Sequence, residues 1–173
     1  MRAVSLTNRG GRKNNEDHIA YANADGIWCF VLCDGLGGQE CGEVASEIVC
    51  NVICEEFKKE PEISSESIRG YALKAAEKLG QERDADMEKY NMSSTVVVLL
   101  TDGKKAIWLH MGDSRLYFFG EKWYNRKEMM KGEEKCGSTS YFRTWDFCQD
   151  VTAPVPFHAV RSSLTACPPH API

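Results

Sequence analysis

The order of the expected secondary structure predicts an α+β protein with a largely antiparallel sheet. Short strands come first, two amphipathic helices follow, and a run of strands comes after the helices. The later strands flank Asp102-Gly103, a dipeptide typical of tight hairpin turns. Because strands and helices are segregated and do not alternate, βαβ units with a parallel sheet are not expected.

The first part of the chain contains three candidate strands. Two are short, at residues 3–6 and 18–22, and the third is the apolar run from Trp28 to Cys33. A continuous apolar run of this length, bounded by polar residues and glycines, is typical of a buried strand. Asp34 follows this strand directly, so the sequence predicts a carboxylate at its end.

Two segments have the hydrophobic period of an α-helix. In residues 42–59 apolar side chains recur every three to four positions, and charged or polar side chains occupy the other face. Pro61 helps to end this helix. A second helix is expected at about residues 66–90. Its apolar side is formed by Ile68, Ala72, Ala75, Ala76 and Leu79.

The last predicted strands precede a change in the character of the sequence. Strands are expected at residues 94–101, 106–110 and 115–119. After about residue 120 the periodicity fades, and five of the six prolines lie beyond residue 153. We therefore expect an organised part over residues 1–120 and a divergent, partly irregular tail over residues 121–173.

The composition argues against several classes of function. The chain has 173 residues, of which 43% are hydrophobic and 27% charged, and its net charge is -4. No basic run is longer than Lys104-Lys105, so nucleic-acid binding has no support. No apolar run approaches the ~18 residues of a membrane span, and the start lacks the apolar core of a signal peptide. We therefore expect a cytoplasmic protein that binds neither nucleic acid nor membranes.

The eight cysteines leave a zinc or redox protein open as an alternative. No Cys-x-x-Cys pair occurs among them. Cys50 and Cys54 lie one helical turn apart and could share a metal. A looser zinc set would consist of Cys136, Cys148, His158 and Cys167. Reduced and mostly structural thiols are the favoured interpretation, because Cys29 and Cys33 lie in an apolar strand, where a free cysteine behaves as a small hydrophobe.

The residues around the apolar strand indicate metal and phosphate chemistry. Asp34 is followed by Gly35, and glycine lets a backbone carbonyl come close to a ligand. Oxygen ligands suit Mg²⁺ or Mn²⁺, and two such cations can lower the pKa of a shared water and neutralise a phosphoryl group under attack. Arg12 offers a planar fork for phosphate oxygens. Glu16 and Asp17 could order metal-bound waters or hold Arg12 in place.

Five short motifs carry a family resemblance. In chain order they are Arg12-x-x-Asn15-Glu16-Asp17, Asp34-Gly35-x-Gly37-Gly38, Gly42-Glu43-x-Ala45-Ser46, Met92-Ser93-Ser94-Thr95 and Gly112-Asp113-Ser114-Arg115. Each alone is ordinary, since an isolated Asp-Gly is usually a turn. Their order and spacing together resemble the bacterial branch of the PPM (PP2C-type) metal-dependent protein serine/threonine phosphatases, over residues 1–120.

The resemblance implies a fold, a site and a reaction. The fold would be a four-layer α/β/β/α sandwich with the metals between two antiparallel sheets, incomplete here at the C-terminus. Two Mn²⁺ or Mg²⁺ ions, and a third that binds more weakly, would be held by Asp34, Gly35 and Asp113. Arg12 would bind the substrate phosphate, and Glu16 would act through metal-bound water. The implied substrates are phosphoserine and phosphothreonine on proteins, opposing a serine/threonine kinase, with the chain as a monomer.

The chain also departs from the family pattern. Family members supply two further metal-binding aspartates from their C-terminal half, in an Asp-Gly and an Asp-Asn motif. After Asp113 this chain has only Asp146 and Asp150, and neither matches. Leu36 stands where some members carry a histidine proposed as general acid. The alternative function is therefore a truncated, inactive phosphatase-like chain that at most binds phosphorylated partners.

Overall fold

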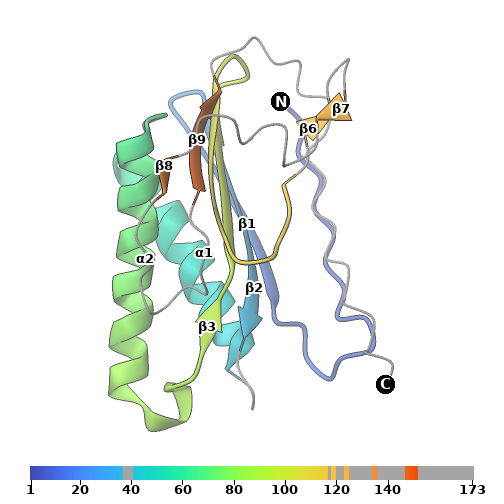
Figure 1. The fold of residues 1–173 in the computed structure, drawn as a ribbon, viewed down its shortest axis with the longest axis vertical. Coiled ribbons are helices and arrows are strands. Elements are labelled where there is room, and N and C mark those ends of the chain that lie inside the picture. Colours follow the sequence, from blue (N-terminus) through green and yellow to red (C-terminus); the bar gives the residue numbers. More distant parts are fainter. Residues whose placement is uncertain (37–40, 117, 120–122, 125–133, 136–146, 152–173) are drawn as a thin grey trace.

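The fold is built on one antiparallel sheet with two helices on one face (Figure 1). The computed structural model describes residues 1–36, 41–116, 118–119, 123–124, 134–135 and 147–151. Among these residues the main sheet has seven strands in the order β1-β2-β4-β5-β9-β8, with β3 beside the end of β2, and β6 and β7 form a separate pair. Every pairing is antiparallel, which confirms the predicted sheet type. The strands are β1 (Asp17–Ala24), β2 (Ile27–Leu36), β3 (Ser93–Ser94), β4 (Val96–Thr101), β5 (Ala106–Met111), β6 (Phe118–Phe119), β7 (Trp123–Tyr124), β8 (Glu134–Lys135) and β9 (Phe147–Val151).

The helices follow the predicted hydrophobic pattern. Helix α1 (Gly42–Lys59) has the bounds that its period predicts. Helix α2 (Ser65–Ala85) begins at a capping box, in which the Ser64 hydroxyl accepts a hydrogen bond from the Ser67 amide at 3.0 Å. It ends five residues before the predicted residue 90. Asp86 adopts an extended backbone there and caps a short 3₁₀ helix, η1 (Met87–Lys89), by accepting from the Glu88 amide.

The core lies between the helices and one face of the sheet. Along β2, β4 and β5 alternate residues point into it, as the period of a strand requires. The largest fully buried side chains include Phe57, Ile53, Ile68, Leu79 and Leu100. Because the alternation places Cys33 and Gly35 on the helix side, Asp34 faces the opposite side of the sheet. The register of the core strands thus decides on which side of the sheet Asp34 lies.

The cysteines in the described part of the chain are free thiols, as predicted. Cys29, Cys33, Cys50 and Cys54 are buried between β2 and α1, and Cys41 is partly buried. Of the looser zinc set, Cys136, His158 and Cys167 lie outside the described residues, and Cys148 is described only by its backbone in β9. The core thiols therefore serve as small apolar side chains.

Two predicted strands differ from the structure. Residues 3–6 form no strand: they are exposed, and no strand of the described chain pairs with them, so their backbone has no ladder to join. Of the predicted strand 115–119, residues 115 and 116 form no strand, Phe118–Phe119 form β6, and residue 117 lies outside the described residues. The chain turns at Gly112–Ser114 and leaves the main sheet. Strand β9 was not expected, and its backbone pairs with β5. None of the described helices has the length and apolar character needed to cross a membrane.

Candidate metal and phosphate site

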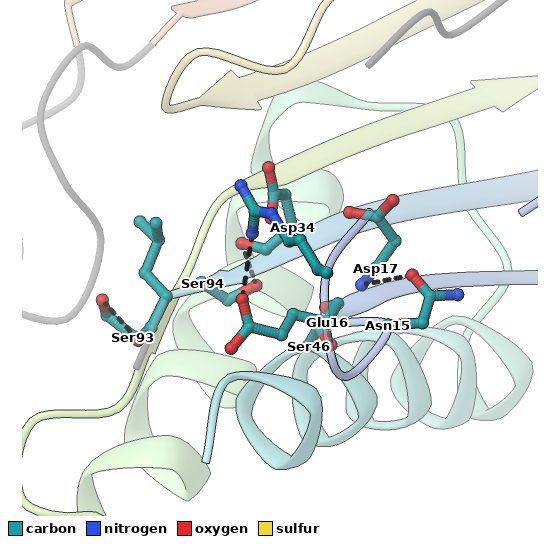
Figure 2. Close-up of polar contacts among 9 residues, drawn as sticks. Asn15, Glu16, Asp17, Asp34, Ser46, Ser93 and Ser94 are labelled. Atoms are coloured by element: carbon teal, nitrogen blue, oxygen red, sulfur yellow. Dashed lines mark hydrogen bonds and ion pairs between the residues drawn. The ribbon is translucent and has the colours of Figure 1, made fainter. Parts of the chain in front are cut away.

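Two carboxylates lie opposite each other where β1 begins and β2 ends. The ladder pairs Asp17 with Asp34, and both side chains lie on the face of the sheet away from α1 (Figure 2). Directly opposite residues of an antiparallel pair have Cβ atoms about 4.5–5.5 Å apart. The start of β1 is held by Asn15, whose Oδ1 accepts a hydrogen bond from the Asp17 amide at 3.3 Å. The register of one hairpin therefore creates an acidic sheet edge.

The pKa of each of the two carboxyl groups is raised, mainly by burial. Burial, and next the charge of Asp17, raise the pKa of Asp34 to about 6, against the lowering effect of Arg12. Burial likewise raises the pKa of Asp17, although Arg12 and a hydrogen bond between the two carboxyl groups lower it. Two half-buried carboxylates this close together are suited to a divalent cation, which neutralises both and is bound well by oxygen ligands. The donor chemistry of Asp34 and Asp17 thus fits Mn²⁺ or Mg²⁺.

The segment before β1 places an arginine beside these acids. Arg12 Nη1 donates to Glu16 Oε2 at 3.0 Å, and the arginine side chain remains 62% exposed. The Glu16 carbonyl accepts from the Gly35 amide at 2.9 Å and from the Ser46 hydroxyl at 2.6 Å. Figure 2 shows Glu16 and Ser46 side by side. Strand β2 and helix α1 therefore hold the backbone of Glu16, which in turn orients Arg12 by a charge-assisted hydrogen bond. The exposed guanidinium is therefore accessible to a ligand.

Two glycines are required where β2 meets the start of α1. A Cβ atom on Gly35 would overlap the backbone carbonyl of Gly42, and one on Gly42 would lie 2.8 Å from Glu16 Oε1. The φ angle of neither residue is positive, so the need is for space and not for an unusual conformation. This close approach explains why both the Asp-Gly and the Gly-Glu-x-Ala-Ser motif contain glycine at these positions.

A third carboxylate comes from the turn after β5. Asp113 is exposed between Gly112, whose φ is +103°, and Ser114, which is buried. The charge of Asp113 contributes to the raised pKa of Asp34, so the two side chains lie within electrostatic reach. Behind them, Thr95 accepts a hydrogen bond from the Asp34 amide at 3.0 Å and contacts the Ser114 hydroxyl at 2.8 Å.

The structure brings together most of the predicted site residues. Arg12, Glu16 and Asp34 meet at one edge, and Asp113, in the turn after β5, is close enough for its charge to raise the pKa of Asp34. Even so, no group of three or more histidine, cysteine, aspartate or glutamate side chains suited to a metal forms within the described part of the chain. Gly37, Gly38 and Asp146 lie outside that part. The backbone of Asp150 pairs with Ile107, which is near the end of β5 remote from Asp113.

Asp17, Thr95 and Ser114 have more direct roles in the structure than the sequence predicts. The sequence predicts a supporting role for Asp17, whereas the register makes Asp17 the direct neighbour of Asp34. Thr95 and Ser114 belong to motifs that the sequence shows, but their contact depends on the pairing of β4 with β5. The motifs contain these residues, but their contacts with Asp34 and with each other follow only from the pairing of the strands.

The α+β fold is shared with solved serine/threonine phosphatases. Residues 7–134 match the model of the protein phosphatase 2C family, and the chain belongs to this family. It is 27% identical over 124 residues to the serine/threonine phosphatase stp of Listeria monocytogenes, covering 68% of this chain and 49% of that protein. It is 31% identical over 132 residues to the protein phosphatase PhpP of Streptococcus pneumoniae, and this match covers 65% of this chain and 48% of PhpP.

A solved structure agrees with these relatives. The catalytic domain of the serine/threonine protein phosphatase PstP, in complex with two manganese ions, superposes with a TM-score of 0.59 at 28% identity. The match covers 67% of this chain and 50% of that one. The chain thus spans about half the length of the relatives that it matches. The family resemblance expected from the five motifs is confirmed.

Proposed function

We propose that this chain carries the phosphate-binding part and the first metal ligands of a protein phosphatase that hydrolyses phosphoserine and phosphothreonine with Mn²⁺ or Mg²⁺. The observation that supports it most is the facing pair Asp17 and Asp34, with the Arg12–Glu16 ion pair beside it. An acidic pair attracts the cation, and an adjacent exposed guanidinium attracts the phosphate. Together they suit a phosphomonoester bound next to a divalent ion.

The residues have distinct roles in this proposal. Asp34 and the Gly35 carbonyl would hold two cations, and Asp113 would take part in a third, weaker site. When bound, the cations supply a water of lowered pKa as nucleophile and offset negative charge on the phosphoryl group. Arg12 would bind two phosphate oxygens through its fork. Glu16 would keep the guanidinium in place and order water at the edge.

Release of the alcohol needs a proton. The side chain of Leu36, at the end of β2, has no titratable group, so it cannot supply this proton. Water at the exposed edge would then protonate the leaving oxygen of serine or threonine. We further propose that the substrates are phosphorylated proteins, that the chain opposes a serine/threonine kinase, and that it acts in the cytoplasm as a monomer.

The full 173-residue chain can be tested directly with a phosphothreonine peptide and with p-nitrophenyl phosphate. We expect turnover that requires Mn²⁺ or Mg²⁺ and disappears when the ions are chelated. Turnover that persists after chelation would exclude the proposed mechanism, because the acidified water exists only while the cations are bound.

A second function is favoured by one observation. Within the described residues the acidic edge lacks a set of three close metal-binding side chains. A cation held mainly by water binds weakly, since little compensates its dehydration. The chain would then bind phosphorylated partners through Arg12 with little turnover. Titration calorimetry with Mn²⁺ separates the two functions: two tight sites that are lost in Asp146→Ala or Asp150→Ala would exclude this second one.

A further inference from the structure

Thr95 holds the main chain of Asp34 by two hydrogen bonds. The Asp34 amide donates to Thr95 Oγ1 at 3.0 Å, and the Thr95 amide donates to the Asp34 carbonyl at 2.8 Å. The regular ladder between β2 and β4 reaches only to the pair Leu32 and Val97. The pairing of β2 resumes with β3 at Gly35 and Ser94, so Thr95 attaches Asp34 in the gap between the two ladders.

The same hydroxyl reaches the turn that carries Asp113. Thr95 Oγ1 lies 2.8 Å from Ser114 Oγ, and the two residues are only 2% and 3% exposed. A hydroxyl has one donor and two acceptor positions, so Thr95 can serve Asp34 and Ser114 at once. The Ser114 carbonyl lies 2.6 Å from His110 Nε2, and because a carbonyl only accepts, that nitrogen carries the hydrogen.

The methyl group of Thr95 contacts the other side of this turn. Gly112 has a φ of +103°, and a Cβ atom there would lie 2.6 Å from Thr95 Cγ2. Gly112 and Ser114 are the two chain neighbours of Asp113. The methyl group of Thr95 packs on Gly112, and its hydroxyl forms a hydrogen bond with Ser114. Asp113 itself stays exposed, and its charge reaches Asp34.

We infer that Thr95 and Ser114 are positioning residues, whose paired hydroxyls link Asp34 to the turn bearing Asp113 and so set the spacing of these two carboxylates. Their importance for metal binding rests on the proposed function. The link itself is a property of the fold, because it joins groups that lie 61 and 19 residues apart in the chain. It connects the two candidate cation positions, and neither Thr95 nor Ser114 is among the residues proposed to bind the cations.

A matched set of variants separates this role from ordinary structural support. Thr95→Val keeps the shape and the methyl group but removes the hydroxyl, whereas Thr95→Ser keeps the hydroxyl. Ser114→Ala removes the other hydroxyl. Thr101→Val is the control, because Thr101 is equally buried at the opposite end of β4 and uses its hydroxyl on Lys105 and Gly103. It removes similar hydrogen bonds far from the site.

The first measurement is amide hydrogen exchange at Asp34 in the metal-free full chain, followed by NMR. Thr95→Val and Ser114→Ala should each speed exchange at Asp34 by about tenfold, since a buried hydrogen bond is lost or loosened. Thr95→Ser and Thr101→Val should stay within about threefold of the wild-type rate. Wild-type exchange at Asp34 in Ser114→Ala would overturn the inference, because the hydroxyl pair would then not act as a link.

The second measurement is Mn²⁺ affinity by titration calorimetry, with circular dichroism to verify folding. Thr95→Val and Ser114→Ala should each lower the affinity for Mn²⁺ by about three- to tenfold. Because both substitutions break the same link, the double variant should lose no more affinity than the more affected single variant. Unchanged or fully additive affinities would refute the positioning role. If the wild-type chain bound no Mn²⁺, the proposed function would fail, and the exchange experiment would still decide whether the link exists.

Discussion

Asp34-Gly35 and Asp102-Gly103 are the same dipeptide at opposite ends of one sheet, with opposite environments. Asp102-Gly103 turns the chain from β4 to β5: Gly103 has a φ of +87°, and Asp102 Oδ1 accepts from the amides of Lys104 and Lys105, each at 2.7 Å. Asp34-Gly35 lies within β2, opposite Asp17. The dipeptide alone therefore does not distinguish a turn from a candidate metal ligand.

The pKa values of the two aspartates show the difference most directly. Hydrogen bonds from the backbone amides of Lys105 and Lys104 stabilise the charged form and lower the pKa of Asp102. Burial and the charge of Asp17 destabilise the charged form and raise the pKa of Asp34 to about 6. In the turn, the Asp102 carboxylate is stabilised by hydrogen bonds from two backbone amides. A cation site needs carboxylates that the protein leaves incompletely compensated.

The largest contrast is expected for the two glycines. Gly35→Ala would push a Cβ into the Gly42 carbonyl, and because both groups are backbone the clash cannot be relieved by a side-chain rotation. We expect the free energy of unfolding to fall by about 3 kcal/mol or more. Gly103→Ala should cost only about 1–2 kcal/mol, from the positive φ. Urea unfolding measures both, and equal losses would show that β2 and α1 can separate at little cost.

The next contrast concerns turnover. Asp34→Asn should lower Mn²⁺-dependent hydrolysis of p-nitrophenyl phosphate by at least about a hundredfold, because an amide neutralises no cation charge. Asp102→Asn should leave turnover within about twofold, since the Asn oxygen can still accept in the turn. Activity retained in Asp34→Asn would remove this residue from the metal site.

A smaller effect is expected at the phosphate. Arg12→Ala removes charge-assisted hydrogen bonds worth about 1.5–3 kcal/mol, so kcat/KM should fall by roughly ten- to a hundredfold. The affinity for Mn²⁺ should barely change, because a guanidinium cannot ligate a cation. Arg9→Ala is the control: Arg9 is a nearby arginine whose side chain bonds the Lys13 carbonyl instead of an acid. A Mn²⁺ titration shifted as far in Arg12→Ala as in Asp34→Asn would show that the assignment of Arg12 is wrong.

The smallest contrast is the pH dependence of stability with a chelator present. Folding raises the pKa of Asp34 from its ordinary value of 3.8 to about 6. The contribution of Asp34 to stability is therefore complete below pH 3.8 and is lost as the pH rises through about 6. At pH 7, Asp34→Asn should therefore be more stable than the wild type, by about 1 kcal/mol once solvent screening is considered. The gain should vanish near pH 4.

The opposite sign is expected at the turn. Folding lowers the pKa of Asp102. The contribution of Asp102 to stability is therefore present above its ordinary pKa of 3.8, and it is lost as the pH falls through the lower pKa of the folded state. Asp102→Ala should therefore lower stability at pH 7. Denaturant unfolding at pH 4 and pH 7 checks both aspartates, and the same sign for both would contradict the contrast between the two regions.

Local signals in the sequence determined a large part of the fold. The period of apolar residues predicted α1 over its full length, and the apolar run predicted the middle of β2. These features depend on neighbours within one turn or a few residues, so the sequence displays them directly. The motifs likewise identified the family and the residues Arg12, Glu16 and Asp34, which the structure brings to one edge.

Only the tertiary structure decided what those residues touch. Three features depend on which strands pair and in which register. Residues 3–6 form no strand, Asp17 lies opposite Asp34, and Thr95 joins Asp34 to Ser114. A shift of one residue would turn Asp34 to the helix side, although the sequence would be unchanged. Local periodicity specifies each element, whereas the contacts that give a carboxylate its pKa and its partners arise between elements far apart in the chain.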